Sequence, residues 1–360
     1  MGALDSILLA TDFRTASQKA TDVTIRLAKA LHARVTVLHV REEYLTWPVS
    51  PFENQDQLTD YLNQQEVALV EFMVHAGPPA DLIVRKAREI PAQLIVIGAG
   101  EKIRHDQLAV GPIAEMVLEH AEPPVLVVNP YGPELRFERI LCPVDHSRVS
   151  RRALEDAIQL ARTFHGQLII LSVVPEVSWL TAAVETGQLT DAKLEHEAQW
   201  IKEFDEFLTT VSLEGVSWVR DVRMGKPAEQ IVAAAQEYQA DLLAMGATGR
   251  TGLVRVLLGS VTRRVLRQLP CSLLLVKDQA AFEQQFLLDW ETINRLIAEG
   301  DECLSRSAWA EAAGKFRQAL ALDPYNTAAL DGLIHTCEQL GQHETAQRYR
   351  HRRDQLRQRS

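Results

Sequence analysis

The chain has 360 residues, of which 46% are hydrophobic and 24% are charged, and its formal net charge is −10. This composition is typical of a folded protein of two or three domains, and the acidic balance disfavours non-specific binding to nucleic acid. We therefore expect no nucleic-acid partner. We also expect no membrane partner, because no apolar run approaches the roughly 18 residues of a membrane-spanning helix.

The N-terminal stretch MGALDSILLATDF carries no basic region and no cleavage site, so it predicts a buried strand at residues 4–10 rather than a secretory signal. The four cysteines are scattered and form no CxxC pair, which favours small reduced thiols over a metal site. Together these features predict a cytoplasmic protein without a structural metal.

Two parts of the chain repeat the same pattern. SILLATDF and RILCPVDHS each end a short apolar run with an Asp in a turn, and an amphipathic helix and a second apolar run follow. Asp12 corresponds to Asp145 at an offset of 133 residues, whereas Gly98 corresponds to Gly246 at an offset of 148. One insertion of 15 residues in the second copy explains the difference. We interpret the pattern as a duplication.

Each copy alternates continuous apolar runs, such as QLIILSVV and SLLLVK, with segments of helical spacing. Continuous runs indicate parallel strands that are covered on both faces, and right-handed crossovers between them give a doubly wound α/β fold of the Rossmann-like type. In such a fold a ligand binds at the carboxyl ends of the strands. We place the first domain at 1–132 and the second at 133–279, with the turn-rich VNPYGPE between them.

Residues 280–360 contain no predicted strand and form an all-α tail. Their small, aromatic and stop positions follow a helix-turn-helix unit of 34 residues, and the pattern resembles a tetratricopeptide repeat followed by a degraded second unit. The matching positions are Gly300, Cys303, Ala312, Phe316, Ala319 and Pro324. Since fewer than three such units rarely fold alone, we expect this segment to dock on the α/β body or on a protein partner.

The second copy has a glycine-rich stretch, GATGRTGLVRVLLGSVT, between a buried strand and the last helix of the copy. Gly246 at the strand end would let a ligand approach the backbone, and Gly249 and Gly252 would permit turns that aim N–H groups at one place. Gly259 and Ser260 would then open the helix, whose first N–H groups attract anions. The stretch therefore predicts a cradle for a diphosphate or triphosphate.

The spacing G-x2-G-x9-G-S resembles the ATP-binding signature of the universal stress protein family, and the resemblance covers both copies, roughly residues 4–278. It implies a cofactor, ATP with Mg²⁺, and an internal pairing of the two copies through their last strands, PPVLVVNP and CSLLLVK. It also implies that adenine and ribose are held by Pro143, Val144, Asp145 and Val173, the ribose and α-phosphate side by Met245, Gly246 and Gly249, and the outer phosphates by Gly259, Ser260, Val261 and Thr262. From the residues themselves we add Arg250, whose charge would attract phosphate, and Gly252, which permits the turn.

The first copy departs from this signature. Glu101 stands where the second glycine is expected, and Pro112 replaces the serine, which removes one N–H donor together with the hydroxyl. We therefore expect the first copy to act as a structural partner of the second.

Catalytic machinery is absent from the sequence patterns: there is no GxxxxGK[ST], no GxSxG and no HExxH. We assign no catalytic residue and expect His146, next to Asp145, to be a solvent-facing loop residue. The favoured function is that of an ATP-binding stress or regulatory protein with slow or no turnover, with self-association into a homodimer left open. The alternatives are a nucleotide-free scaffold that recruits partners through the tail, and a slow ATPase.

Overall fold

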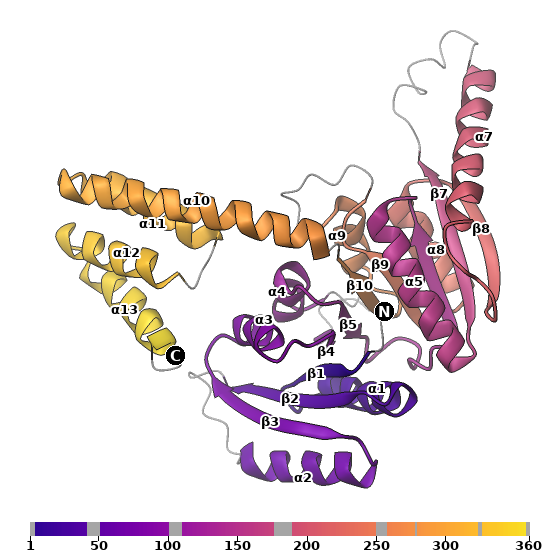
Figure 1. The fold of residues 1–360 in the computed structure, drawn as a ribbon, viewed down its shortest axis with the longest axis horizontal. Coiled ribbons are helices and arrows are strands. Elements are labelled where there is room, and N and C mark those ends of the chain that lie inside the picture. Colours follow the sequence, from indigo (N-terminus) through magenta and orange to yellow (C-terminus); the bar gives the residue numbers. More distant parts are fainter. Residues whose placement is uncertain are drawn as a thin grey trace. The chain divides into compact units, whose positions relative to one another are not determined.

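The computed structural model describes residues 4–41, 51–100, 110–175, 189–249, 258–277, 279–322 and 326–357. The chain forms two compact units, residues 1–279 and 280–360, which appear in Figure 1 as the α/β unit and the helices coloured orange to yellow. Each unit is described by itself.

The α/β unit contains two halves with the same order of elements. The first half consists of β1 (Ser6–Thr11), α1 (Thr15–Leu31), β2 (Arg34–Arg41), α2 (Pro51–Gln64), β3 (Leu69–Ala76), α3 (Pro79–Glu89), β4 (Leu94–Gly98), α4 (Pro112–His120) and β5 (Val125–Val128). The second half consists of β6 (Arg139–Val144), α5 (Arg148–Phe164), β7 (Gln167–Pro175), α7 (Leu189–Leu208), β8 (Ser217–Gly225), α8 (Pro227–Glu237), β9 (Leu242–Gly246), α9 (Ser260–Leu266) and β10 (Ser272–Val276).

The ten strands that the structure describes belong to one sheet, in the order β3-β2-β1-β4-β5-β10-β9-β6-β7-β8. Within each half the neighbouring strands are parallel. The halves join through β5 and β10, which pair antiparallel with Leu274 opposite Leu126. The expected contact between the last strands of the two copies is confirmed, and the doubly wound α/β fold is present in both.

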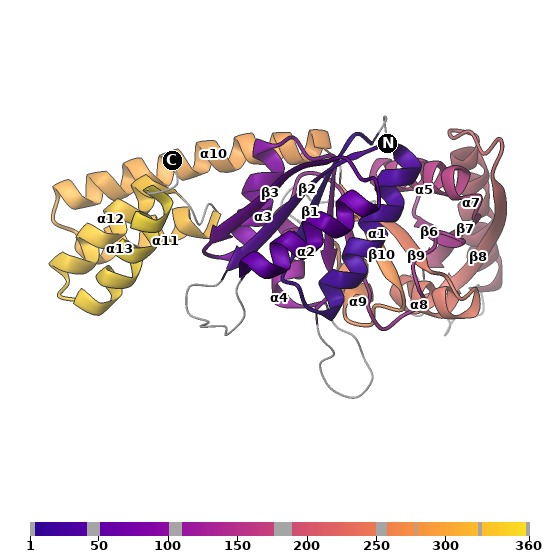
Figure 2. The same ribbon diagram turned by 90° about the horizontal axis from the view of Figure 1, so that it is seen from below.

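The sheet is buried on both faces, which explains the continuous apolar runs. One face packs against α1, α2, α5 and α7, and the other against α3, α4, α8 and α9. Figure 2 shows α1 and α2 in front of the strands of the first half. Because successive side chains of a strand point to opposite faces, Leu168 and Ile170 of β7 contribute to the first core, and Ile169 and Leu171 to the second.

The segment between the halves is fixed by a buried carboxylate. Asp241, at the start of β9, accepts hydrogen bonds from three backbone N–H groups between residues 136 and 139, at 2.8–3.2 Å. The Phe137 ring is fully buried and stacks on Phe164, with ring centroids 4.4 Å apart. A Cβ at Gly166 would lie 2.0 Å from the Phe137 carbonyl oxygen, so only glycine fits there.

Two related side chains cross the junction between the halves in opposite directions. Asn129, just after β5, donates from Nδ2 to the carbonyl oxygen of Leu269 at 3.1 Å. Lys277, just after β10, donates from Nζ to the carbonyl oxygens of Ala121 and Glu119 at 2.7 and 2.6 Å. Donor and acceptor positions correspond at the same offset of 148 residues found in the sequence. The amide of Asn129 therefore links the two halves at one place, and the buried amine of Lys277 links them at the corresponding place.

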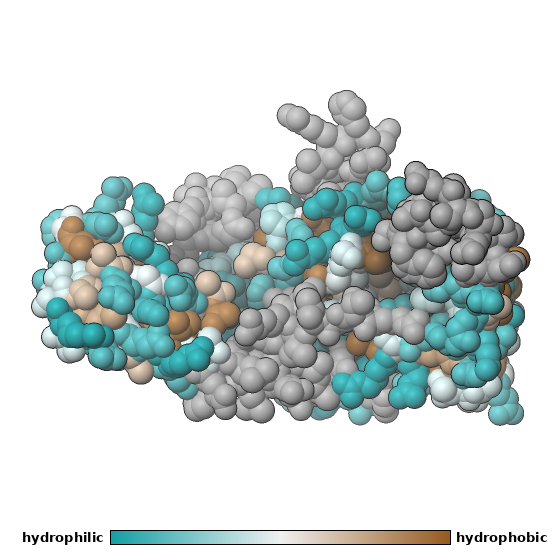
Figure 3. All heavy atoms as spheres, turned by 90° about the horizontal axis from the view of Figure 1, so that it is seen from above, coloured by the Kyte–Doolittle hydropathy of each residue, from teal (hydrophilic) through white to brown (hydrophobic). Residues whose placement is uncertain are grey.

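The second unit consists of α10 (Gln279–Ser305), α11 (Trp309–Leu322), α12 (Thr327–Gln339) and α13 (His343–Arg357). The described residues of the tail are thus helical, as predicted from the sequence. Phe316 of α11 is fully buried, and a Cβ at Gly300 or at Gly332 would lie 2.7 or 2.3 Å from its ring. The ring therefore needs glycine on both α10 and α12. In Figure 3 hydrophilic residues cover most of the described surface of this unit, with small apolar patches between them.

The buried amine of Lys277 predicts a pH-dependent stability. Burial lowers its pKa to about 7, although the carboxylate of Glu119 acts in the opposite direction. In the unfolded chain the pKa is near its ordinary value of about 10.4, so between pH 7 and 10 the unfolded state binds more protons and stability rises with pH.

We therefore expect the free energy of unfolding of the wild type, relative to Lys277→Met, to increase from pH 7 to pH 10, by at most about 1.4 kcal/mol per pH unit. Urea unfolding of both proteins at several pH values measures this difference. Parallel curves for the two proteins over that range would contradict the assignment.

Candidate functional site

The carboxyl ends of β6, β7 and β9 bring most of the predicted site residues to one edge of the sheet. Val144 at the end of β6 pairs with Ser172 of β7, so Asp145 and Val173 both lie at this edge. Gly246 ends β9, which is the neighbour of β6 on its other side. Parallel strands end at a common edge, which is why segments a hundred residues apart meet there.

Asp145 is oriented by the first turn of α5. Its Oδ1 accepts hydrogen bonds from the N–H and the hydroxyl of Ser147, at 3.2 and 2.6 Å. Ser147 is the N-cap of α5, and its hydroxyl oxygen in turn accepts from the N–H of Ser150 at 3.2 Å. The other carboxylate oxygen, Oδ2, faces Gly249, where a Cβ would lie 2.6 Å from it. Any side chain at Gly249 would displace this carboxylate.

The two described ends of the glycine stretch, residues 246–249 and 258–262, are joined by hydrogen bonds. The N–H of Gly259 donates to the carbonyl oxygen of Ala247 at 2.8 Å. The buried hydroxyl of Thr262 lies 3.1 Å from the same oxygen and 3.3 Å from that of Gly246. These bonds bring the start of α9 against the end of β9. They also occupy the Thr262 hydroxyl, so this residue can offer a ligand only its backbone N–H.

The first turn of α9 supplies the remaining donors. Gly259 is its N-cap in an extended conformation, and no side chain caps the helix. Within the described part of the chain, the N–H groups of Ser260, Val261 and Thr262 donate to no acceptor. Ser260 is exposed. Unbonded N–H groups at a helix start, at the same edge as Asp145, favour an anion there.

Two predicted residues, Arg250 and Gly252, lie outside the described residues, as does Glu101 of the first half. The roles given to the other predicted residues stay predictions, although the fold brings them to one edge.

The corresponding loop of the first half has the same backbone closure with fewer donors. Asp12 accepts from the N–H of Arg14 at 3.0 Å and from the hydroxyl of Ser17 at 2.7 Å. The N–H of Gly111 donates to the carbonyl oxygen of Ala99 at 2.8 Å, as Gly259 does to Ala247. Pro112 then opens α4 without an N–H. The frame of the site is retained in both halves, but one donor is missing in the first.

His146 does not face solvent, contrary to the expectation from sequence. Its backbone is left-handed, with φ at 64°, and its side chain is only 7% exposed. The ring lies between Ser172 of β7, 3.2 Å from Nε2, and the side chains of Trp200 and Phe204 of α7. Trp200 and Phe204 were missed because they come from the segment that contains the insertion, and no short motif marks them.

The described residues offer little for covalent or metal chemistry. Burial raises the pKa of the Cys142 and Cys271 thiols far above neutrality, so neither is a nucleophile. Over the part of the chain that the structure describes, no three His, Cys, Asp or Glu side chains could share a metal ion. What the site offers is main-chain N–H groups and one oriented carboxylate beside Gly249.

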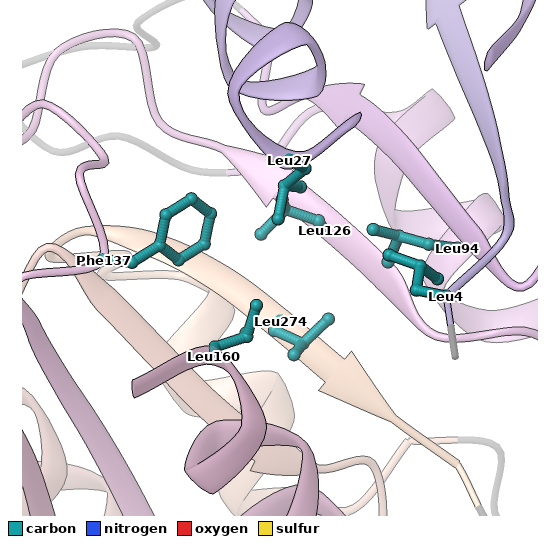
Figure 4. Close-up of a pocket in the computed structure, with 7 residues that line it drawn as sticks. All are labelled: Leu4, Leu27, Leu94, Leu126, Phe137, Leu160 and Leu274. Carbon is teal, nitrogen blue, oxygen red and sulfur yellow. The ribbon is translucent and has the colours of Figure 1, made fainter. Parts of the chain in front are cut away.

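A small cavity lies elsewhere in the unit. Figure 4 shows its seven lining side chains, all apolar, which come from both halves and point toward one another: Leu4, Leu27, Leu94, Leu126, Phe137, Leu160 and Leu274. Its volume of about 10 Å³ is at the lower limit for a single water molecule. It is a packing defect at the junction between the halves and is too small for a ligand.

Comparison with known proteins gives a consistent result. The model of the universal stress protein family matches residues 4–129 and 136–277. A universal stress protein of Methanocaldococcus jannaschii is 34% identical over 146 residues, which are 39% of this chain and 82% of that protein. A putative universal stress protein of Pseudomonas aeruginosa has a similar fold, with a TM-score of 0.61 and 17% identity over 79% of this chain and 98% of that chain. One from Archaeoglobus fulgidus has a TM-score of 0.54 and 20% identity over 77% and 99%.

The close approach at Gly246 predicts a loss of stability on substitution. A Cβ there would lie 2.9 Å from Cγ1 of Val149 and 3.3 Å from the N atom of Ser150, so α5 would have to shift. We expect Gly246→Ala to lower the free energy of unfolding by about 1–3 kcal/mol. Gly314→Ala is the control, because nothing lies within 4 Å of its Cβ. Thermal unfolding of both variants and of the wild type measures the difference, and a midpoint of Gly246→Ala equal to that of the wild type would show that the approach is not tight.

Proposed function

Because the chain belongs to the universal stress protein family, we propose that residues 133–279 bind an adenine nucleotide, ATP, at the carboxyl edge of β6, β7 and β9. In this proposal adenine and ribose lie beside residues 143–145 and Val173, and the phosphates lie over Gly249 and the start of α9. Residues 1–132 form the partner domain that retains the frame of the site without its full set of donors.

One observation carries the proposal. The N–H groups of Ser260, Val261 and Thr262 have no acceptor among the described residues, and they lie at the edge where β9 ends at Gly246 and Asp145 follows β6. A phosphate group would supply acceptors to these donors and would meet the positive end of the α9 dipole.

Mg²⁺ would enter together with the phosphates rather than through a protein cage. Mg²⁺ in nucleotide sites keeps several waters and takes one or two carboxylates besides phosphate oxygens. Asp145 supplies one carboxylate at this edge, with Oδ2 facing Gly249. The described residues therefore fit a Mg²⁺ ion that is bound mainly by the phosphate oxygens of the nucleotide and by water.

We propose a regulatory rather than a metabolic role. Hydrolysis needs a group that orients the attacking water, and the described site residues offer no histidine or second carboxylate in that position. Binding instead stabilises the folded state, by an amount that grows with nucleotide concentration. We place this activity in the cytoplasm.

The helical unit is proposed as the element that meets a protein partner. The close contact of Phe316 with Gly300 and Gly332 supports the proposal of a tetratricopeptide-like unit, and α13 carries arginines. Two of these, Arg350 and Arg353, form ion pairs with Glu338 and Asp331 of α12, so part of the basic charge serves the unit itself. In the α/β unit β5 and β10 are already paired, so a homodimer of the whole chain would have to use another surface.

Gly259 and Gly111 give a matched test of the nucleotide site. A side chain at Gly259 would lie 3.3 Å from the carbonyl oxygen of Ala247, and at Gly111 it would lie 3.5 Å from that of Ala99. We expect Gly259→Glu to abolish the rise in melting temperature on addition of ATP, because a carboxylate would then stand at the start of α9. Gly111→Glu should keep the full rise.

Calorimetric titration with ATP and mass spectrometry of the freshly purified protein complete the test. Loss of ATP binding in both variants would place the nucleotide elsewhere or in both halves. Absence of ATP binding by the wild type, with no adenine nucleotide released from the purified protein, would leave the alternative of a nucleotide-free scaffold.

A further inference from the structure

The carboxyl edge that carries the candidate site is also contacted from the opposite face of the sheet. Val173 and Met245 belong to the core on the side of α8 and α9, whereas Ser172 precedes Val173 in the same strand and points to the other face, toward α7. The side chains of Asp145 and His146 also point to opposite faces of the sheet. The Asp145 carboxylate faces Gly249, and the His146 ring faces α7.

One hydroxyl joins the groups on the α7 side. Ser172 Oγ is fully buried, and the indole N–H of Trp200 donates to it at 2.9 Å. The Nε2 atom of His146 lies 3.2 Å from the same oxygen, and a carboxylate oxygen of Glu203 lies 3.8 Å from Nδ1. The ring centroids of His146 and Trp200 are 4.9 Å apart. Trp200 itself is 8% exposed.

Helix α7 presents a single face to this group. Trp200, Glu203, Phe204 and Phe207 are spaced at i, i+3, i+4 and i+7, and all four approach His146. His146 reaches them because its φ of 64° turns the side chain away from that of Asp145. A non-glycine residue in this conformation costs about 1 kcal/mol or more, which the contacts with α7 offset.

The first half has a ring contact at the corresponding positions. Phe13 and His39 stand at the positions of His146 and Ser172, at an offset of 133 residues. Phe13 also has a left-handed backbone, with φ at 61°, and its ring lies 4.7 Å from that of His39. The contact between these two positions is thus part of the fold, whereas the hydrogen bonds to a tryptophan of the covering helix belong to the second half, which has the full glycine signature.

We propose that Ser172 and His146 are positioning residues that couple occupancy of the nucleotide site to the seating of α7. This inference rests on the proposed function. The peptides 145–146 and 172–173 each have one residue on the ligand side and one in the hydrogen-bonded group with Trp200. A ligand that moves Asp145 and Val173 therefore also moves His146 and Ser172, and so changes the hydrogen bond between Ser172 and Trp200. In the other direction, a displacement of α7 changes the position of His146 and with it that of Asp145.

Trp200 is the natural reporter for the test. ATP is titrated into the full chain while indole emission is followed, and the same titration of Trp200→Phe gives by difference the part due to Trp200. Calorimetry on the same samples measures ATP binding independently of any fluorescence. Coupling predicts a Trp200 signal with the same midpoint as the heat of binding.

Ser172→Ala tests the route, because it removes the hydroxyl that both Trp200 and His146 contact. We expect it to lose the ATP-linked Trp200 signal and to raise the Kd for ATP about fivefold, the size expected for one hydrogen bond. Thr210→Ala is the matched control: its hydroxyl donates to the Phe207 carbonyl oxygen at 2.7 Å just after α7 and takes no part in the group. This variant should keep both the signal and the affinity.

The outcomes separate the two proposals. Heat of ATP binding without a Trp200 signal in the wild type overturns the coupling and leaves the nucleotide site standing, and so does a full signal in Ser172→Ala. Absence of any heat in the wild type overturns the proposed function and the coupling with it. Should Ser172→Ala not fold, hydrogen exchange of the wild type decides: coupling requires ATP to protect residues 194–208 together with residues 145–150.

Discussion

The antiparallel pairing of β5 with β10 is the interaction on which the rest of the α/β unit depends. Each half by itself would end in an unpaired apolar strand, with Val125–Val128 in one and Ser272–Val276 in the other, and such an edge invites aggregation. Pairing the two edges merges the halves into one sheet and builds two cores that extend across the junction. Because β5 and β10 pair through backbone hydrogen bonds, the pairing persists while the side chains of the two copies diverge.

That independence explains how one half can lose a signature and still be needed. Pro112 removes a donor from the first half, yet the Gly111 N–H still closes the loop on Ala99, and α4 still ends where Lys277 meets its last carbonyl groups. The first half therefore supports the second through its frame. The exchange of an asparagine for a lysine at the two crossing positions shows the same freedom, since both side chains donate to the same kind of helix-end carbonyl group.

The candidate site is defined by where side chains are missing. Gly246 lies against the first turn of α5, and Gly249 lies under the Asp145 carboxylate, so each glycine is explained by a close neighbour from another part of the chain. Both faces of the sheet meet at this edge. The glycine stretch and α9 occupy one side, and the group formed by His146, Ser172 and Trp200 occupies the other. A ligand at this edge is therefore placed to affect both sides.

The sequence predicted the duplication, the alternation of strands and helices, and the helical tail. It also predicted, from the glycine spacing, a site at the carboxyl ends of the strands. Each of these rests on a local or periodic pattern that the backbone must follow. The family resemblance was also visible there, and the family comparison confirms it. Only the tertiary structure decided that the Thr262 hydroxyl is occupied by the loop's own carbonyl groups and that His146 turns inward to Trp200. Both facts depend on contacts between segments separated in the chain, with a left-handed residue at the turn, and residue spacing alone carries no information about such contacts.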